Sequence, residues 1–258
     1  MDIEEVASGG VIEAAELAPR GEGRVFAGVR PIRLADADPS GRLRLDALAR
    51  HLQDVATDDV NDAGAGNDKL TWVVRRSAFV AEAWPLYGER VTYSTFCSGI
   101  GPRWADRRTS GRSSQGSHVE AAVLWVCLDL RSGRPATLPE GFHPLWGATA
   151  GGRVVSARLH HPPPPDGMTG RPWQVRVTDL DVLGHVNNAV YWAAVEDEIA
   201  RQLPGRVPIA AECEYRLPLE LDDPAALVSD VDGSTLRMWV VSPRGSHASV
   251  VVRCQPSA

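Results

Sequence analysis

The chain has 258 residues, of which 43% are hydrophobic and 23% are charged, and its formal net charge is −6. This length suits one large domain or two of roughly 100–130 residues, and the chain contains no apolar run long enough to span a membrane. The negative charge argues against nucleic acid as a partner. Residues 1–23 are acidic and lack the pattern of a secretory signal, so we expect a cytoplasmic protein with a disordered acidic tail.

The elements predicted after this tail are a strand, a turn, a helix and then consecutive strands. Residues 24–34 favour a strand, and residues 45–56 place apolar side chains on one face of a helix. Four β-rich segments follow, at residues 72–80, 91–98, 103–109 and 120–130. One helix followed by successive antiparallel strands predicts an α+β module over residues 24–148.

A proline-rich tract separates this module from a second one. Residues 162–165 are consecutive prolines, which resist helix and sheet and stay extended. We therefore place a linker at residues 149–172 and the second module at residues 173–258. This module is predicted to contain a strand at 173–178, a helix from about residue 189, and later strands at residues 209–217, 227–231, 235–242 and 248–253.

The two modules share a motif just before their helices. Asp36-x-Asp38-x-x-Gly41 matches Asp179-x-Asp181-x-x-Gly184, and the second glycine lies 143 residues after the first. The same offset aligns Gln53 with Glu196. We therefore interpret the chain as two copies of one module. Their exposed sheet edges are expected to pair into one continuous sheet.

The second copy of the motif carries polar groups that the first copy lacks. His185 has Arg42 as its counterpart, and Asn187-Asn188 has Arg44-Leu45. The predicted strand, turn and helix around Gly184 place the unpaired backbone N–H groups of a helix N-terminus beside this imidazole and these amides. Such a site can stabilise an oxyanion. The second module is therefore predicted to be the catalytic half.

The string Asp179-x-Asp181-x-x-Gly184-His185-x-Asn187-Asn188-x-x-Tyr191 resembles the hot-dog superfamily, and within it the acyl-acyl-carrier-protein (acyl-ACP) thioesterases. The resemblance implies two tandem hot-dog modules, each a curved antiparallel sheet wrapped around a long helix. It also implies hydrolysis of fatty acyl thioesters to free fatty acids in fatty acid biosynthesis, with the first module shaping the acyl pocket. It extends over about residues 25–254 through three first-half segments, Trp72-Val73-Val74-x-Arg76, Trp84-Pro85-x-x-Gly88 and Arg131-x-Gly133-Arg134-Pro135.

Thioester hydrolysis needs a group that activates water and donors that stabilise an oxyanion. Asp181 is the candidate carboxylate for activating or orienting water, and His185 is the candidate general base or the group that orients the carbonyl. Asn187 is expected to hold water or substrate, whereas Asn188 is expected to cap the helix. Backbone N–H groups are expected to bind the oxyanion, at Gly184 and Val186.

The chain departs from the family pattern at two places. Leu183 stands where the family has an asparagine, and Leu217-Pro218-Leu219 follows Tyr215-Arg216 where the family has an acidic residue and a cysteine. The missing carboxylate is then expected from Glu196, which matches the position that many small hot-dog thioesterases use, or from Glu220. Two alternatives stay open: a hot-dog 3-hydroxyacyl dehydratase or enoyl hydratase, and an acyl-thioester-binding protein without turnover.

The resemblance also defines the expected partners. The expected partner is acyl carrier protein carrying a fatty acyl chain, or acyl-CoA. Neither a membrane nor nucleic acid is expected as a partner. No metal or organic cofactor is implied, and the four separated cysteines predict buried thiols rather than zinc ligands. The sequence leaves open the length and saturation of the acyl chain, and whether the chain is a monomer or a homodimer. The densest basic region is a candidate docking face for an acidic carrier protein: Arg75, Arg76, Arg103, Arg107, Arg108 and Arg112.

Overall fold

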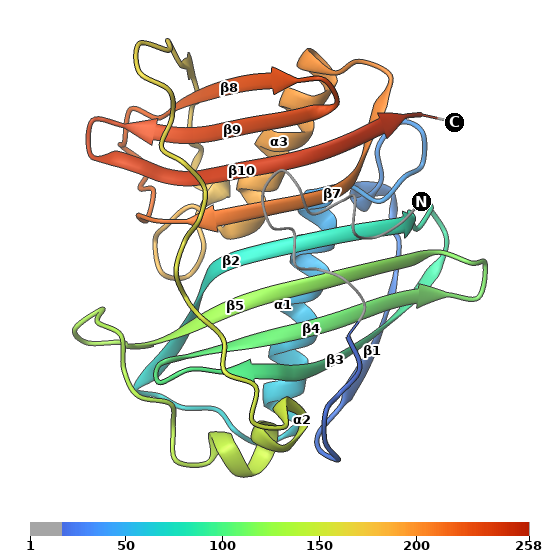
Figure 1. Cartoon of the computed structure of the whole chain (residues 1–258), viewed down its shortest axis with the longest axis vertical. Helices are drawn as coiled ribbons and strands as arrows, with labels where there is room; N and C mark the ends of the chain where they lie inside the picture. Colours follow the sequence, from blue (N-terminus) through green and yellow to red (C-terminus); the bar gives the residue numbers. More distant parts are fainter. Residues whose placement is uncertain (1–16, 258) are drawn as a thin grey trace.

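The computed structural model describes residues 17–257. Within them, ten strands form one antiparallel sheet in the order β1-β3-β4-β5-β2-β7-β10-β9-β8-β6 (Figure 1). The first half of the chain contributes β1 (Phe26–Pro31), β2 (Leu70–Ala83), β3 (Arg90–Ile100), β4 (Trp104–Ser113) and β5 (His118–Asp129). The second half contributes β6 (Arg171–Pro172), β7 (Arg206–Tyr215), β8 (Ala226–Asp232), β9 (Thr235–Ser242) and β10 (Gly245–Pro256).

The two halves meet where β2 pairs with β7, from Arg76 opposite Glu214 to Val80 opposite Ala210. Each of these strands would be an edge of its own half-sheet, so the pairing satisfies backbone groups that would otherwise face solvent. Each half thus combines an antiparallel sheet with one long helix. The predicted fold, two tandem hot-dog modules in one chain, is confirmed.

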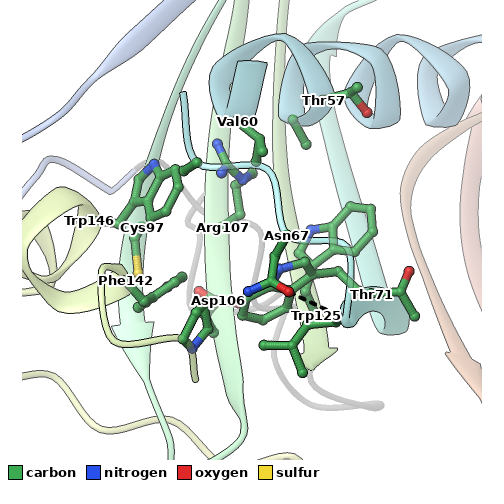
Figure 2. Close-up of a pocket in the computed structure, with 16 residues that line it drawn as sticks. Thr57, Val60, Asn67, Thr71, Cys97, Asp106, Arg107, Trp125, Phe142 and Trp146 are labelled. Atoms are coloured by element: carbon green, nitrogen blue, oxygen red, sulfur yellow. Dashed lines mark hydrogen bonds between the residues drawn. The ribbon is translucent and has the colours of Figure 1, made fainter. Parts of the chain in front are cut away.

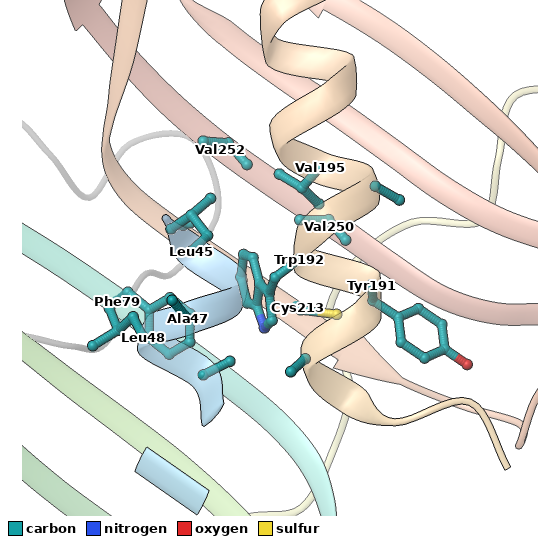
Figure 3. Close-up of a cluster of buried hydrophobic side chains, with 14 of the residues drawn as sticks. Leu45, Ala47, Leu48, Phe79, Tyr191, Trp192, Val195, Cys213, Val250 and Val252 are labelled. Carbon is teal, nitrogen blue, oxygen red and sulfur yellow. The ribbon is translucent and has the colours of Figure 1, made fainter. Parts of the chain in front are cut away.

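Helices α1 (Leu45–Asp62) and α3 (Asn188–Gln202) contact each other and cover the same face of the sheet (Figure 1). The two helices and the sheet enclose the main core. In α3, Trp192 is fully buried, and its ring centroid lies 4.6 Å from that of Phe79 on β2 (Figure 3). Helix α1 is amphipathic and buries apolar side chains at helical spacing, namely Leu45, Leu48, Leu52 and Val55.

The 143-residue repeat is present in the structure as well as in the sequence. The helices begin at Leu45 and Asn188, which are equivalent positions of the repeat. The turn before each helix contains a glycine with positive φ, +88° at Gly41 and +77° at Gly184. This backbone conformation is accessible to glycine at little cost, which explains the glycine in both copies of the motif.

The strand predicted at residues 173–178 is absent. The chain pairs with β8 only through β6, and it then leaves the sheet to form a 3-10 turn at Val177–Asp179. Pro172 lacks the N–H that a longer ladder needs, and Trp173 makes a single bond to Ala225 O at 2.8 Å. The alternating sequence therefore belongs to a segment that carries the chain from the sheet edge to the start of α3.

The proline-rich linker crosses the face of the sheet opposite to the two helices (Figure 1). It follows a short helical segment, His143–Gly147 and α2 (Ala148–Ala150), that packs beside β3. Most of the predicted tail, residues 1–23, lies outside the described residues. No helix among residues 17–257 is both long enough and apolar enough to cross a membrane.

Candidate active site

Helix α3 begins with an asparagine cap. Asn187 is extended (φ −61°, ψ 140°), and its Oδ1 accepts the N–H of Ala189 at 2.9 Å. This bond satisfies one of the backbone donors that a helix N-terminus leaves unpaired. The prediction that Asn188 is the cap is therefore wrong by one residue. Asn188 is the first residue of the helix and lines a small cavity below its N-terminus.

Asp181 holds the turn that precedes the helix. Its Oδ1 accepts the N–H of Leu183 at 2.9 Å, and in the first module Asp38 accepts the N–H of Ser40 at the same distance. Because the first module lacks the other polar groups of the motif, this bond belongs to the turn rather than to catalysis. The second carboxylate oxygen of Asp181 has no hydrogen bond within residues 17–257.

The two backbone donors predicted for the oxyanion are occupied. The N–H of Gly184 donates to Asp181 O at 3.0 Å, and the N–H of Val186 donates to Leu219 O at 2.8 Å. Two neighbouring N–H groups, those of His185 and Asn188, have no hydrogen-bond acceptor among the described residues. Asn188 N–H belongs to the first turn of α3, where the helix dipole also favours negative charge. It replaces Gly184 and Val186 as the candidate oxyanion donor.

Gln53 of α1 faces this helix start and was not predicted as a site residue. Its carboxamide lies 3.4 Å from the Asn187 carboxamide in both directions, nitrogen to oxygen and oxygen to nitrogen. Gln53 also lines the same small cavity as Asn188. The sequence repeat could have indicated Gln53. It aligns Gln53 with Glu196, so the two side chains are expected to contact equivalent positions on the opposite helix.

Glu196 performs the equivalent contact at the start of α1. Its Oε1 accepts the N–H of Leu45 at 2.7 Å, and its Oε2 accepts from Arg42 Nη2 at 2.7 Å. Arg42 is itself buried and lies over the ring of Trp84, 5.2 Å from the centroid. The structure therefore places Glu196 at the N-terminus of the other helix and does not bring it to His185.

His185 is half-buried, and its imidazole has no hydrogen-bond partner within residues 17–257. It lines an open depression together with Glu220 and Arg244. Glu220 Oε1 lies 3.1 Å from Arg244 Nη1, so its charge is paired. Of the two carboxylates considered for completing the site, Glu220 is the one that the structure brings near His185.

Two cavities that share Trp125 as a lining residue lie between the start of α3 and the far end of the first module. A narrow space of about 20 Å³ below the helix start is lined by Gln53, Asn188, Tyr215 and Trp125, among others. Trp125 also lines a larger cavity of about 300 Å³ between the end of α1, β2 and the segment before α2 (Figure 2). The lining of this second cavity includes four aromatic side chains, Trp72, Trp125, Phe142 and Trp146.

The cysteines near these cavities are not suited to nucleophilic attack. Cys97 lines the larger cavity, and burial raises the pKa of its thiol to about 11. Burial likewise raises the pKa of Cys213, which is completely buried behind α3. A thiol with a raised pKa carries little of the reactive thiolate at neutral pH. Neither residue offers the cysteine that the family pattern places after the Tyr-Arg pair.

Three of the six arginines predicted to form a basic docking face are engaged within the fold. Arg107 Nη1 lies 2.8 Å from the buried carboxylate of Asp59, and Arg108 Nε lies 3.3 Å from Asp106. Arg75 donates to Tyr215 O at 2.8 Å. These three guanidinium groups make contacts within the fold, whereas Arg103 and Arg112 are exposed.

Comparison with known proteins identifies the family. The profile of the acyl-ACP thioesterase N-terminal domain matches residues 23–144, and that of the C-terminal domain matches residues 164–241. The chain is 28% identical over 220 residues to the uncharacterized protein Rv2001 of Mycobacterium tuberculosis, which covers 84% of this chain and 87% of that protein.

Solved structures share the fold. The 12:0-ACP thioesterase from Umbellularia californica has a TM-score of 0.76 at 21% identity and covers 92% of this chain and 99% of its own. An acyl-ACP thioesterase from Bacteroides thetaiotaomicron has a TM-score of 0.71 at 19% identity and covers 90% and 98%. With both family domains matched in order along its length, the chain belongs to the acyl-ACP thioesterase family of thioester hydrolases.

Proposed function

We propose that this chain hydrolyses fatty acyl-ACP at the N-terminus of α3, with Asn188 N–H and His185 as the central groups. The observation that carries the proposal is the unpaired N–H of Asn188. It lies at the positive end of a helix dipole, and Asn188 lines the small cavity at the start of α3. A donor fixed in this way stabilises negative charge that develops on a carbonyl oxygen.

The acyl chain is placed in the first module. Its carbonyl lies between Asn188 and Gln53, and its hydrocarbon passes Trp125 into the aromatic cavity of about 300 Å³ (Figure 2). Removing this apolar chain from water favours binding. The thiol arm of the carrier then extends past His185 to the open depression that Glu220 and Arg244 line.

The reaction is a water-dependent acyl transfer. His185 accepts a proton from water as the water oxygen bonds to the thioester carbonyl carbon. The resulting oxyanion accepts the N–H of Asn188, and the carboxamide of Gln53 lines the space beside it. The intermediate then expels the carrier thiolate, which takes the proton from His185. Asp181 orients the water through its unpaired oxygen, and Asn187 positions Gln53 through their amide pair.

The test is thiol release from a panel of acyl-ACP and acyl-CoA thioesters with medium and long chains, measured for the wild type and His185→Ala. We expect wild-type turnover and a loss of about 10²- to 10⁴-fold in kcat for the variant, which is the contribution of a general base. His160→Ala is the matched control, because His160 is exposed and its side chain makes no hydrogen bond within residues 17–257. This control should retain the wild-type rate.

Two results would overturn the proposal. Binding of acyl thioesters without thiol release would identify a binding protein, in keeping with Leu183 and Pro218 standing where the family has polar groups. Release of water, or its addition, with the thioester left intact would identify a dehydratase or hydratase. All proposed site residues come from one chain, so we also propose that a monomer is sufficient and that kcat does not depend on protein concentration.

A further inference from the structure

The linker between the modules is fixed to the sheet at several points. Trp104 Nε1 donates to Val155 O at 2.8 Å, and Trp239 Nε1 donates to Pro162 O at 2.9 Å. Arg216 Nη2 donates to His161 O at 2.9 Å. These bonds hold the linker as a strap across the face opposite to the helices (Figure 1). At its centre, the strap covers two carboxylates of β7.

Glu212 and Glu214 lie on the same face of β7, because side chains alternate along a strand. They are 2% and 0% exposed. Glu214 is well compensated, since it accepts the backbone N–H groups of His160 and His161 and lies 3.0 Å from Arg216. Glu212 has His161 as its charge partner, and its Oε2 has no hydrogen-bond partner within residues 17–257. A buried carboxylate in this condition is costly.

The contacts of the His161 ring indicate which group could compensate the buried charge of Glu212. Nδ1 lies 3.1 Å from the carbonyl oxygen of Ser249 and 3.2 Å from its hydroxyl oxygen. Because the carbonyl can only accept, its contact is a hydrogen bond when Nδ1 carries the proton. Nε2 then faces Glu212 Oε1 at 3.1 Å. A second proton on Nε2 would pair with Oε1 alone and leave Oε2 without a partner. A metal ion bound by Nε2 and the two carboxylates would compensate both oxygens of Glu212.

We propose that His161, Glu212 and Glu214 bind a divalent transition-metal ion of the Zn²⁺ class, which fastens the linker to β7. One ligand atom from each residue lies within 4.8 Å of the other two. The 3.1 Å between Nε2 and Oε1 is close to the roughly 3.3 Å edge of a tetrahedral zinc site. A histidine that binds zinc through one nitrogen usually donates its other N–H to a backbone carbonyl, as His161 does to Ser249.

The His118 cluster shows how a histidine that is compensated by protons alone differs from the His161 cluster. Both ring nitrogens of His118 face carboxylates, Glu120 at 2.6 Å and Glu82 at 3.0 Å. A doubly protonated imidazolium satisfies both of these contacts. In the His161 cluster, by contrast, one ring nitrogen faces a carbonyl and two carboxylates remain near the other. The proposed site is independent of the thioesterase site, which lies on the helix side of the sheet.

The experiment is a titration of the full chain with Zn²⁺ after chelator treatment, followed by calorimetry and by thermal unfolding. We expect one Zn²⁺ per chain and a rise in Tm, because an ion that binds the folded state stabilises it. Glu212→Gln and His161→Gln should each weaken binding by more than about 100-fold, since loss of a ligand costs at least as much as loss of its supporting hydrogen bond. Asp230→Asn is the matched control for surface carboxylates and should bind as the wild type does.

A measurement on the wild type alone tests the proposal even if the variants fail to fold. The Co²⁺ form should show a ligand-field spectrum of nitrogen and oxygen ligands without a thiolate charge-transfer band, because the four cysteines take no part. Absence of stoichiometric Zn²⁺ binding by the wild type would overturn the proposal. So would a thiolate band, or unchanged Zn²⁺ affinity in both folded variants.

Discussion

The two helix N-termini of this protein are built alike and are filled differently. At α1, the carboxylate of Glu196 accepts the N–H of Leu45 and is paired with the buried guanidinium of Arg42. At α3, the equivalent N–H of Asn188 has no acceptor within residues 17–257, and the neutral carboxamide of Gln53 faces it. The first terminus is closed by an internal anion. The second leaves an N–H without an acceptor where the helix dipole favours negative charge.

The charges around the two termini follow the same division. At α1, burial by itself would raise the pKa of Asp46, but hydrogen bonds from Arg44 and Arg50 outweigh it and lower that pKa. At α3, Asn187 and Gln53 are neutral amides. The shared turn therefore provides the backbone in both modules, while the side chains that face the first N–H of the helix are charged at α1 and neutral at α3.

Among changes that distinguish the two helix starts, removing the backbone donor of α3 should produce the largest effect. In Asn188→Pro the N–H is lost, while proline suits the first helical position and the extended Asn187 before it. We expect kcat to fall by about 10²- to 10³-fold, the usual cost of one oxyanion donor, with little change in Tm. Asn188→Ala keeps the N–H and should lose far less activity. Equal losses in the two variants would mean that the side chain, not the N–H, is required.

Making the second terminus resemble the first should give the next largest effect. Gln53→Glu places at α3 the carboxylate that Glu196 places at α1, where it can accept the N–H of Asn188 and repel the oxyanion. We expect kcat/KM to fall by roughly 30- to 100-fold, somewhat less than for full loss of a donor. The midpoint of urea unfolding should not decrease.

Gln53→Met removes the carboxamide without adding charge, so it serves as the control for Gln53→Glu and should lose only a few-fold in kcat/KM. Wild-type activity in Gln53→Glu would show that the carboxylate does not reach Asn188, and it would remove Gln53 from the proposed site. A comparable loss in Gln53→Met would assign the effect to the missing amide instead.

Much of the fold could be predicted because it rests on local patterns. The apolar face of α1 and the β-rich segments are visible as periodicity, and the offset between Gly41 and Gly184 revealed the duplication. The strand predicted at residues 173–178 is absent because alternating polar and apolar residues indicate a β-like sequence but do not show whether a neighbouring strand is available for pairing. At that sheet edge the chain must leave β8 to reach the start of α3.

The sequence motif suggested where the candidate site lies, but it did not show which backbone donors are unpaired there. The motif predicted a site at the start of α3. No local sequence rule shows that the N–H groups of Gly184 and Val186 donate to the carbonyl oxygens of Asp181 and Leu219. Contacts between the modules were also hidden, because they join residues far apart in the chain, such as Gln53 and Asn187, which are separated by 134 positions. The repeat implies that equivalent residues of the two modules make equivalent contacts, and this inference would have suggested the contacts between the helices.

Glu196 gives the smallest expected effect and the clearest test of this division between the helices. In Glu196→Gln the side chain can still accept the N–H of Leu45, but the ion pair with Arg42 is lost. We expect the free energy of unfolding to fall by about 1.5 kcal/mol, the scale of a hydrogen bond to a charged group, with kcat within about twofold of the wild type. Urea unfolding and thiol release on the same preparations measure both quantities. A stable variant that loses most of its activity would instead make Glu196 a catalytic carboxylate and α1 part of the reactive site.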